Sequence, residues 1–306
     1  MSSIMTNASA MTALQTLNTI SKNMATTQSR ISTGMRVGEA ADNAAYWSIA
    51  TTMRSDNKAN SVVQDALGLG AGKIDTAYTG INDSIEVVDQ IKEKVLLAKS
   101  ASTEDRAKIQ SEIKALQAHL TDSINAANYA GSNLLQTDST DTINTKLSVI
   151  SSYNRSAAGA VTTGTIEVTF AETRLIDSGA DVGILDTTAT TTGTGAVTQS
   201  ILTLDVTAAN LDDTDFNGLL TAVEAGLKKM ATGAAALGAA KSRVDLQTNF
   251  VSKLSDAIER GVGQLVDADM NEESARLSAL QVQQQLGIQA LSIANSNSQN
   301  ILSLFR

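Results

Sequence analysis

The chain of 306 residues contains no cysteine and no proline. Without cysteine it can form neither disulfides nor thiolate metal sites. At the average usage of about 5%, a chain of this length would contain roughly fifteen prolines. Proline breaks helices because it lacks the backbone donor and clashes with the preceding turn. Its absence therefore permits long, uninterrupted helices.

Aromatic side chains and histidine are also scarce. Aromatic residues make up 3% of the chain and hydrophobic residues 42%. The apolar content is therefore mainly aliphatic, which suits seams between helices better than a compact enzyme core. The single histidine, His119, lies between Leu116 and Leu120 on an expected helix and cannot by itself form a metal cluster or a conventional triad. We expect no catalytic, cofactor-binding or metal-binding residues, and no enzyme activity.

Two short motifs resemble ligand sites only in part. The stretch GLGAGK, Gly68 to Lys73, resembles a phosphate-binding loop, but Leu67 stands where that motif needs its first glycine. We interpret the stretch as a weak point or bend between helices. Asp267, Asp269 and Asn271 have the first spacing of a calcium loop, but the glycine and glutamate required later are missing. These acids favour the start of a helix.

The net charge of −9 argues against nucleic acid and anionic membranes as partners. No apolar run approaches the eighteen or so residues of a spanning helix, so we expect no membrane insertion. The start of the sequence lacks the basic and then apolar pattern of a cleaved signal peptide. If the protein is exported, we expect a route that needs no such peptide.

The chain does have an apolar stripe with helical spacing near each end. A repeat of seven residues with alternating steps of four and three marks a helix that lies along a partner helix. Because no separate core is left for these stripes to cover, we expect them to pack against each other and against other copies of the chain. The candidate self-assembly residues are Leu14, Leu17, Ile20, Met24, Ile31, Ile288, Leu291, Leu302 and Phe305.

Helical spacing also fills much of the interior. The stretches 81–95 and 109–120 should form an antiparallel hairpin of two helices, joined by a short polar link. The stretch from Phe216 to Leu265 keeps its alternating steps without interruption, which predicts one long helix. The polar residues in this stripe, where a seam needs to fix its register, are Lys241, Thr248 and Ser255.

Residues 137–213 differ in composition, with Thr, Gly, Ser and Val predominating. Two stretches, Thr165 to Phe170 and Ile201 to Val206, are typical of strands. The expected fold class is therefore mainly α. It is a long antiparallel, coiled-coil-like helical rod with paired N- and C-terminal helices and a small β-rich insertion at its distal end.

Three motifs, in the same order along the chain, resemble those of bacterial flagellins. The segment RISTGMRVGEAADNAAYWSIA, Arg30 to Ala50, resembles the family signature R-I/L-S-S/T-G-x-R followed by DxAA. The segment VDADMNEESARLSALQ, Val266 to Gln281, resembles the box that precedes the family's C-terminal helix. The segment from Gln283 to Arg306 resembles the family's ending. The residues around Tyr46, Trp47 and Met53 most resemble flagellins of the rhizobial type.

The resemblance implies a structural subunit of the bacterial swimming filament, exported unfolded through the flagellar type III channel and added at the tip beneath a cap. It assigns residues 1–33 and 269–306 to an inner tube of paired terminal helices and 34–42 to a spoke. Residues 43–136 and 214–268 would form a helical rod, and 137–213 a solvent-facing insertion. The spoke residues are Gly34, Arg36, Gly38 and Asp42.

The resemblance also implies partners and a location. The partners are other copies of the chain, alone or with other flagellins, and the export chaperone, cap and hook-junction proteins; the location is the extracellular filament. The resemblance implies that a vertebrate innate receptor recognises many flagellins through a helix of the pattern LQRVRELAVQSA. The corresponding segment here is Gln90 to Ala101. Lys92, Leu96 and Glu112 are the candidate receptor-facing residues. Val95 replaces the family's glutamate, so we expect weak recognition.

Two alternatives fit the residues. A hook-junction subunit related to flagellin would share the end motifs but usually carries a longer middle region. A soluble coiled-coil adaptor would form a fixed small oligomer, whereas a flagellin forms long polymers from seeds.

Overall fold

A computed structural model describes residues 7–156 and 158–303, with side chains described as far as residue 296. The chain forms two compact units. One comprises Met1–Asn57 with Asp256–Arg306, and the other comprises Lys58–Ser255. These units divide within two long helices, α2 (Ala44–Ser100) and α5 (Asp213–Val266), whereas the sequence analysis placed its divisions between elements.

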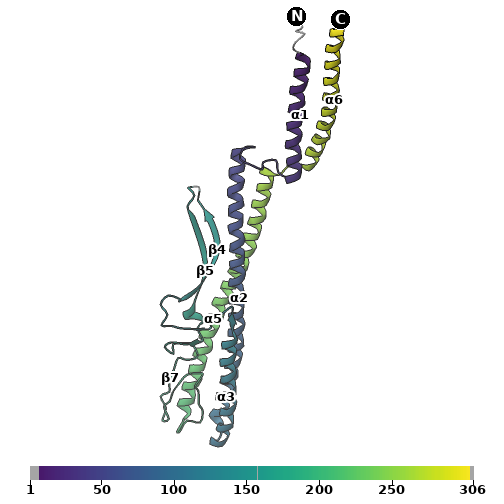
Figure 1. The fold of residues 1–306 in the computed structure, drawn as a ribbon. Helices are drawn as coiled ribbons and strands as arrows, with labels where there is room; N and C mark the ends of the chain where they lie inside the picture. The colour runs from purple at the N-terminus through teal and green to yellow at the C-terminus, as the bar shows by residue number, and fades with distance from the viewer. Residues whose placement is uncertain (1–6, 157, 304–306) are drawn as a thin grey trace. The chain divides into compact units, whose positions relative to one another are not determined.

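The first unit contains a pair of helices from the two ends of the chain. Helix α1 (Ala8–Thr33) and helix α6 (Met270–Ser303) lie side by side and antiparallel (Figure 1). Asn7 caps the start of α1 by accepting a hydrogen bond from the Ala10 amide, and Gly34 ends it in the left-handed conformation, at φ 71°. The predicted pairing of N- and C-terminal helices is confirmed.

The second unit is organised around α2, α3 (Thr103–Ala126) and α5. The predicted long helix from Phe216 onward is confirmed, and its stripe is buried at Phe216, Val223, Met230, Leu237, Val244 and Val251. Lys241 interrupts this stripe with charge, and its Nζ lies 2.6 Å from Asp75 Oδ1 on α2. The cation and carboxylate thus meet across the seam, as a register-fixing pair would.

The glycine-rich stretch from Gly68 to Lys73 is not a bend, and that interpretation was wrong. Helix α2 runs through it without interruption. Glycine costs about 1 kcal/mol in a helix, but here it allows other segments to approach closely. A Cβ added at Gly70 would lie 2.5 Å from Val149 Cγ1, and one added at Gly72 would lie 2.6 Å from Tyr129 Cζ.

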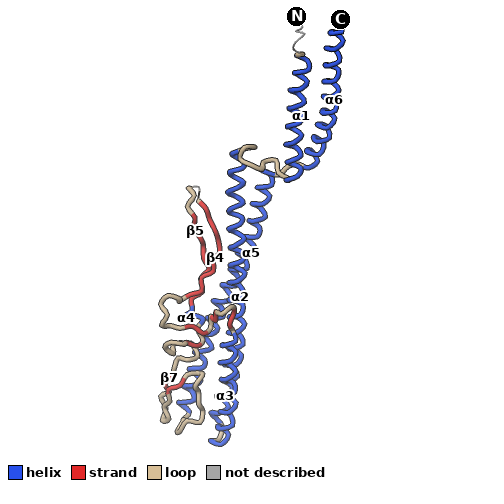
Figure 2. The backbone as a smooth tube through the Cα atoms, in the orientation of Figure 1, coloured by secondary structure: helices blue, strands red, loops and turns tan. Residues whose placement is uncertain are grey.

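The strands belong to small, two-stranded sheets (Figure 2). The longest pair is antiparallel, formed by β4 (Lys146–Arg155) and β5 (Val161–Thr169). This confirms the strand predicted near Thr165, which ends where the short helix α4 (Phe170–Thr173) begins. The remaining strands are β1 (Asn128–Tyr129), β2 (Ser132–Asn133), β3 (Gln136–Thr137), β6 (Ile176–Asp177), β7 (Ala189–Thr190) and β8 (Thr198–Gln199).

The second predicted strand, Ile201 to Val206, was wrong: the segment consists of turns and irregular backbone. Its backbone polar groups bind glutamine side chains of α3 instead of a neighbouring strand. Gln117 Nε2 donates to the carbonyls of Ile201 and Leu204, and Gln110 Oε1 accepts from the Val206 amide. Buried backbone groups need partners, and side chains supply them here.

The insertion and the helices share one hydrophobic core. Leu175, Leu185, Ile201 and Leu204 are buried in the same cluster as residues of α2, α3 and α5. The residues between α3 and α5 are therefore folded onto the helices of this unit. His119 lies on the exposed side of α3.

Candidate functional site: the paired terminal helices

Helices α1 and α6 meet along faces that repeat every seven residues. On α1 this face includes the half-buried Leu17, Ile20, Met24 and Ile31 and the buried Thr27. Four of the predicted self-assembly residues therefore face the other terminal helix of their own chain. Leu14 does not, and is 49% exposed.

The face of α6 toward α1 is displaced from the stripe that the sequence indicated. It consists of Leu277, Leu280, Gln284, Gly287, Leu291 and Ala294. Of the predicted residues only Leu291 belongs to it, because Ile288 is 54% exposed. The side chain of Leu302, and the whole of Phe305, lie outside the described residues.

Two polar contacts and one close approach show how the two helices are aligned. Asn7 Nδ2 donates to the carbonyl of Ala294 at 3.0 Å near one end. Farther along, a Cβ added at Gly287 would lie 3.6 Å from Leu17 Cδ1. At the other end, Arg30 Nη1 lies 3.2 Å from Glu273 Oε1.

Each helix also carries a second set of apolar side chains that α1 and α6 leave uncovered. On α6, Val282, Leu286 and Ile293 are 54%, 57% and 64% exposed. Their spacings of four and seven place them on one side of the helix, opposite the face toward α1. Met11 and Leu14, three residues apart on α1, are similarly exposed. We call these five side chains the outer stripe.

Small residues leave an open groove between the helices near the start of α1. Its volume is about 520 Å³, and it is lined by Ser9, Thr12, Ala13, Thr16, Gly287, Ala290 and Ala294. The helices are therefore not interlocked by bulky side chains at this end.

The predicted spoke is a pair of hydrogen-bonded backbone segments. The amides of Arg36 and Val37 both donate to the carbonyl of Val266, and the Ala268 amide donates to the carbonyl of Gly34. Val37 is buried with Ala50, Val262 and Val266 in a small core.

A tight turn follows in the spoke. Asp42 Oδ2 accepts hydrogen bonds from the amides of Glu39 and Gly38, at 3.1 and 2.9 Å. These bonds favour the carboxylate and lower the pKa of Asp42 below its ordinary value. Arg36 Nη2 donates to the carbonyl of Leu265 at 3.2 Å. The structure thus gives a local role to the side chains of Arg36 and Asp42 and to the backbone of Gly34 and Gly38.

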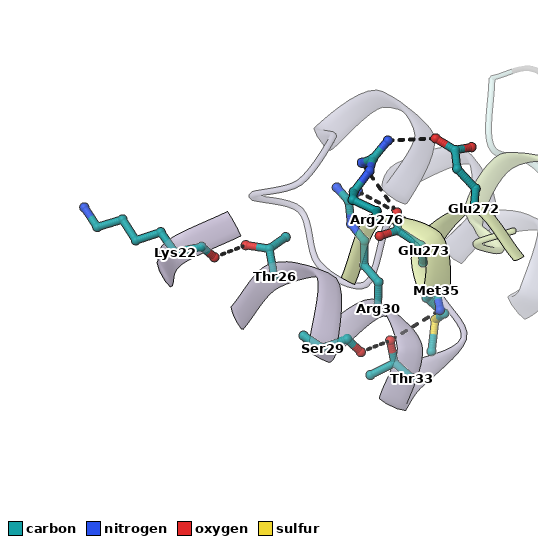
Figure 3. A network of polar contacts seen from close by, with 9 residues as sticks. All are labelled: Lys22, Thr26, Ser29, Arg30, Thr33, Met35, Glu272, Glu273 and Arg276. Carbon is teal, nitrogen blue, oxygen red and sulfur yellow. Dashed lines mark hydrogen bonds and ion pairs between the residues drawn. The ribbon is translucent and has the colours of Figure 1, made fainter. Parts of the chain in front are cut away.

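Charged side chains gather where α1 ends and α6 begins (Figure 3). Glu273 is buried, and its Oε1 lies 3.2 Å from Arg30 and 3.7 Å from Arg276. Arg276 also binds the exposed Glu272, at 2.7 Å. The predicted helix start is confirmed by Asp269, which accepts from the Asn271 amide just before α6. The sequence analysis missed Glu273 as an individual residue, although it lies within the motif that resembles the family's box.

The candidate receptor-facing residues lie on the surface of the other unit. Lys92 Nζ is 2.8 Å from Glu224 Oε2, and this hydrogen bond raises the pKa of Lys92. Leu96 is 59% exposed beside it. Both line an open groove of about 890 Å³ between α2 and α5. Glu112 is on α3, where it pairs with Lys94 at 2.5 Å.

The described part of the chain contains no group of three or more His, Asp or Glu side chains arranged to hold a metal ion. Within the same residues, no helix combines the length and the hydropathy needed to cross a membrane.

Comparisons with known proteins agree with the motifs and the helix pair. The profile of the bacterial flagellin N-terminal helical region matches residues 4–140, and that of the C-terminal helical region matches residues 220–305. The chain is 55% identical to a flagellin of Brucella melitensis and 46% identical to flagellin C of Rhizobium meliloti, each over the full length of both chains. A crystal structure of Bacillus cereus flagellin overlaps 62% of this chain and 88% of its own, with 16% identity and a TM-score of 0.40. Because two family profiles cover both helical ends and full-length relatives exceed 40% identity, the chain belongs to the bacterial flagellin family.

Proposed function

We propose that copies of this chain assemble through the outer stripe of the terminal helices: Met11 and Leu14 on α1, and Val282, Leu286 and Ile293 on α6. As a flagellin, the chain is a structural subunit of the flagellar filament. The proposal concerns which of its surfaces build that filament.

The observation that carries the proposal is that α6 is apolar on two opposite sides. One side packs against α1, and the other exposes Val282, Leu286 and Ile293 to solvent. A helix that is apolar around its circumference is normally buried on all sides. A single chain supplies only one neighbour to this helix in the described structure, so the other neighbours come from other copies.

The outer stripe contains enough apolar surface to drive association. Full burial of an aliphatic side chain stabilises by roughly 1.5–3 kcal/mol. Since Leu286 is 57% and Ile293 64% exposed, each would gain roughly 1–2 kcal/mol on becoming buried between copies. The gain is partly offset by the entropy lost when subunits associate, so each added subunit needs several such contacts.

The test is seeded polymerisation of the double variant Leu286→Gln/Ile293→Gln. The double variant should lose roughly 2–4 kcal/mol of the free energy of association. This loss should raise the critical concentration for polymerisation about thirty-fold or more. The matched control is Ile143→Gln, which removes a side chain that is 87% exposed outside the terminal helices. It should polymerise as the parent does. Normal growth of the double variant, judged by light scattering and electron microscopy, would reject the outer stripe as the assembly surface.

The competing functions predict different products. A soluble adaptor gives one small oligomer at every protein concentration in sedimentation velocity, whereas a filament subunit gives open-ended polymers when seeds are added. A hook-junction subunit polymerises only as a short segment. Long filaments from seeded protein support the proposal against both.

The finer expectations about partners are part of the proposal. The subunit leaves the cell by the flagellar export route without a cleaved signal peptide and reaches the extracellular filament. On the way it meets an export chaperone, the hook-junction proteins and the cap. The helix that contains Lys92 and Leu96 is weakly recognised by the innate receptor, since Val95 replaces an acidic residue of the family pattern. A reporter assay with purified monomer tests this, and full activation would contradict it.

A further inference from the structure

The seam between α1 and α6 does not fix its own alignment. On α1 the face runs through Leu17, Ile20, Met24, Thr27 and Ile31 in steps of three and four. The face of α6 follows the same repeat. Sliding one helix by seven residues, about 10.5 Å, therefore places the same kind of face against its partner. The groove beside Gly287 is lined by small side chains.

Polar contacts, in contrast, are satisfied in one alignment only. Among the described residues, Arg30–Glu273 is the ion pair that joins α1 to α6. A slip of seven residues would move Arg30 from the level of Glu273 to that of Leu280, which is buried. Glu273 would then keep its carboxylate inside the structure without the cation from α1.

The surroundings of Glu273 indicate a role in alignment and not chiefly in stability. The residue is 5% exposed, and its Oε2 is buried with no hydrogen-bond partner among the described residues. Burying a carboxylate costs several kcal/mol, which the contacts with Arg30 at 3.2 Å and Arg276 at 3.7 Å offset only in part. An incompletely satisfied charge adds little to the stability of the correct alignment. It does, however, disfavour every alignment that removes Arg30 and leaves only the longer contact with Arg276.

From these observations we infer that the Arg30–Glu273 contact holds the register of the terminal helix pair, with Glu273 as the positioning residue. It acts together with the backbone bond from the Ala268 amide to the Gly34 carbonyl, which joins the two chain segments just beyond the helices. The Asn7–Ala294 bond is a second fixed point about 21 residues farther along α6. Because both of its partners are neutral, this bond makes a smaller contribution than the hydrogen bond between two charged groups. The inference concerns pairing within one chain and does not depend on the proposed assembly surface.

The cysteine-free sequence allows the register to be measured directly by pairs of introduced cysteines in the full-length chain. Leu17→Cys with Gly287→Cys reports the observed register, because Gly287 has room for a Cβ 3.6 Å from Leu17 Cδ1. Met24→Cys with Gly287→Cys reports a slip of one repeat in one direction, and Leu17→Cys with Leu280→Cys reports a slip in the other. The readout is the yield of crosslink within one chain, identified by mass spectrometry.

With Arg30 and Glu273 intact, the in-register pair should exceed either slipped pair by about tenfold or more, the factor expected for a hydrogen bond to a charged group. In the background Glu273→Gln this ratio should fall several-fold, although the backbone bonds beyond the helices remain, and the exchanged pair R30E/E273R should restore it. The control is Glu272→Gln, which removes the neighbouring but exposed partner of Arg276 and should leave the ratio unchanged.

Three results would overturn the inference. In the first, Glu273→Gln keeps the parental ratio. In the second, the parent forms slipped and in-register crosslinks equally. In the third, the parent forms neither, which would mean that the helices are not paired as observed. A failure of the protein to polymerise would bear on the proposed function and leave these crosslink ratios interpretable.

Discussion

Replacing Gly70 by alanine tests whether α2 needs a glycine at this position so that the β4–β5 hairpin can pack closely against it. Two effects of opposite sign compete. Alanine favours a helix by about 1 kcal/mol relative to glycine. The added Cβ, however, would lie 2.5 and 2.6 Å from the two methyl groups of Val149 and 3.1 Å from its Cβ. Val149 is itself buried on β4, so it has little freedom to move away.

The expected change in the free energy of unfolding follows from comparing two glycines of α2. Overpacking a well-filled site costs about 1–3 kcal/mol, so Gly70→Ala should be destabilising by up to about 2 kcal/mol after the helix gain of about 1 kcal/mol. Gly68 lies on another side of the same helix, and a Cβ there would meet nothing within 4 Å. Gly68→Ala should therefore stabilise the protein by the gain in helix propensity alone, about 1 kcal/mol.

The assay is urea unfolding followed by circular dichroism, with the transition of the unit that contains α3 and the hairpin fitted separately. A third variant, Gly70→Ala/Val149→Ala, removes the clashing methyl groups and should recover part of the lost stability. If Gly70→Ala raised the unfolding midpoint as much as Gly68→Ala does, the close approach would not be the reason for glycine at this position.

Further predictions concern the insertion, in addition to the assembly and register tests above. Gln117→Ala leaves the carbonyl of Ile201 without this donor, while the Leu204 carbonyl keeps its bond from Gln110. The variant should destabilise the unit by about 1–3 kcal/mol, with faster hydrogen exchange in residues 201–206; unchanged exchange there would contradict the role of Gln117. The amides of Thr194 and Asp215, the Thr194 hydroxyl and the Thr214 amide hold the pKa of Asp212 at about 2, below the ordinary value of an aspartate. Because the pKa is lower in the folded state, this stabilisation is present above about pH 4 and is lost as the pH falls through about 2. Asp212→Asn should therefore remove part of the acid-dependent loosening around Thr194, measured by amide exchange between pH 5 and about 2; an unaltered acid profile would contradict it.

The regular helices could be predicted from the sequence because their pattern is local. The stripe from Phe216 to Leu265 repeats without interruption, and the structure has one helix there. The terminal pair was predicted for the same reason, although Ile288 proved to lie outside the face toward α1. Nearly every turn of α6 carries apolar residues on more than one side, so a single stripe could be drawn through it in more than one way.

What the sequence could not show depends on partners distant along the chain. The glycines of α2 look like weak points until Val149 and Tyr129 are known to pack against them. The segment Ile201 to Val206 alternates like a strand, but its amide and carbonyl partners are two glutamines on α3. Glu273 looks like an ordinary first-turn acid, and only the fold reveals that it is buried beside Arg30. None of these pairings leaves a periodic signal.

The side chain of Asn7 connects the start of α1 to α6, which lies far away in the sequence. Asn7 accepts from the Ala10 amide to close the first turn of α1 and, through its Nδ2, donates to a carbonyl 287 residues later. The side-chain amide of Asn7 forms both hydrogen bonds only when α6 is packed against α1. The opening turn of α1 therefore gains its full stability from a segment that the ribosome makes 287 residues later, and α1 and α6 should order together in a single cooperative step.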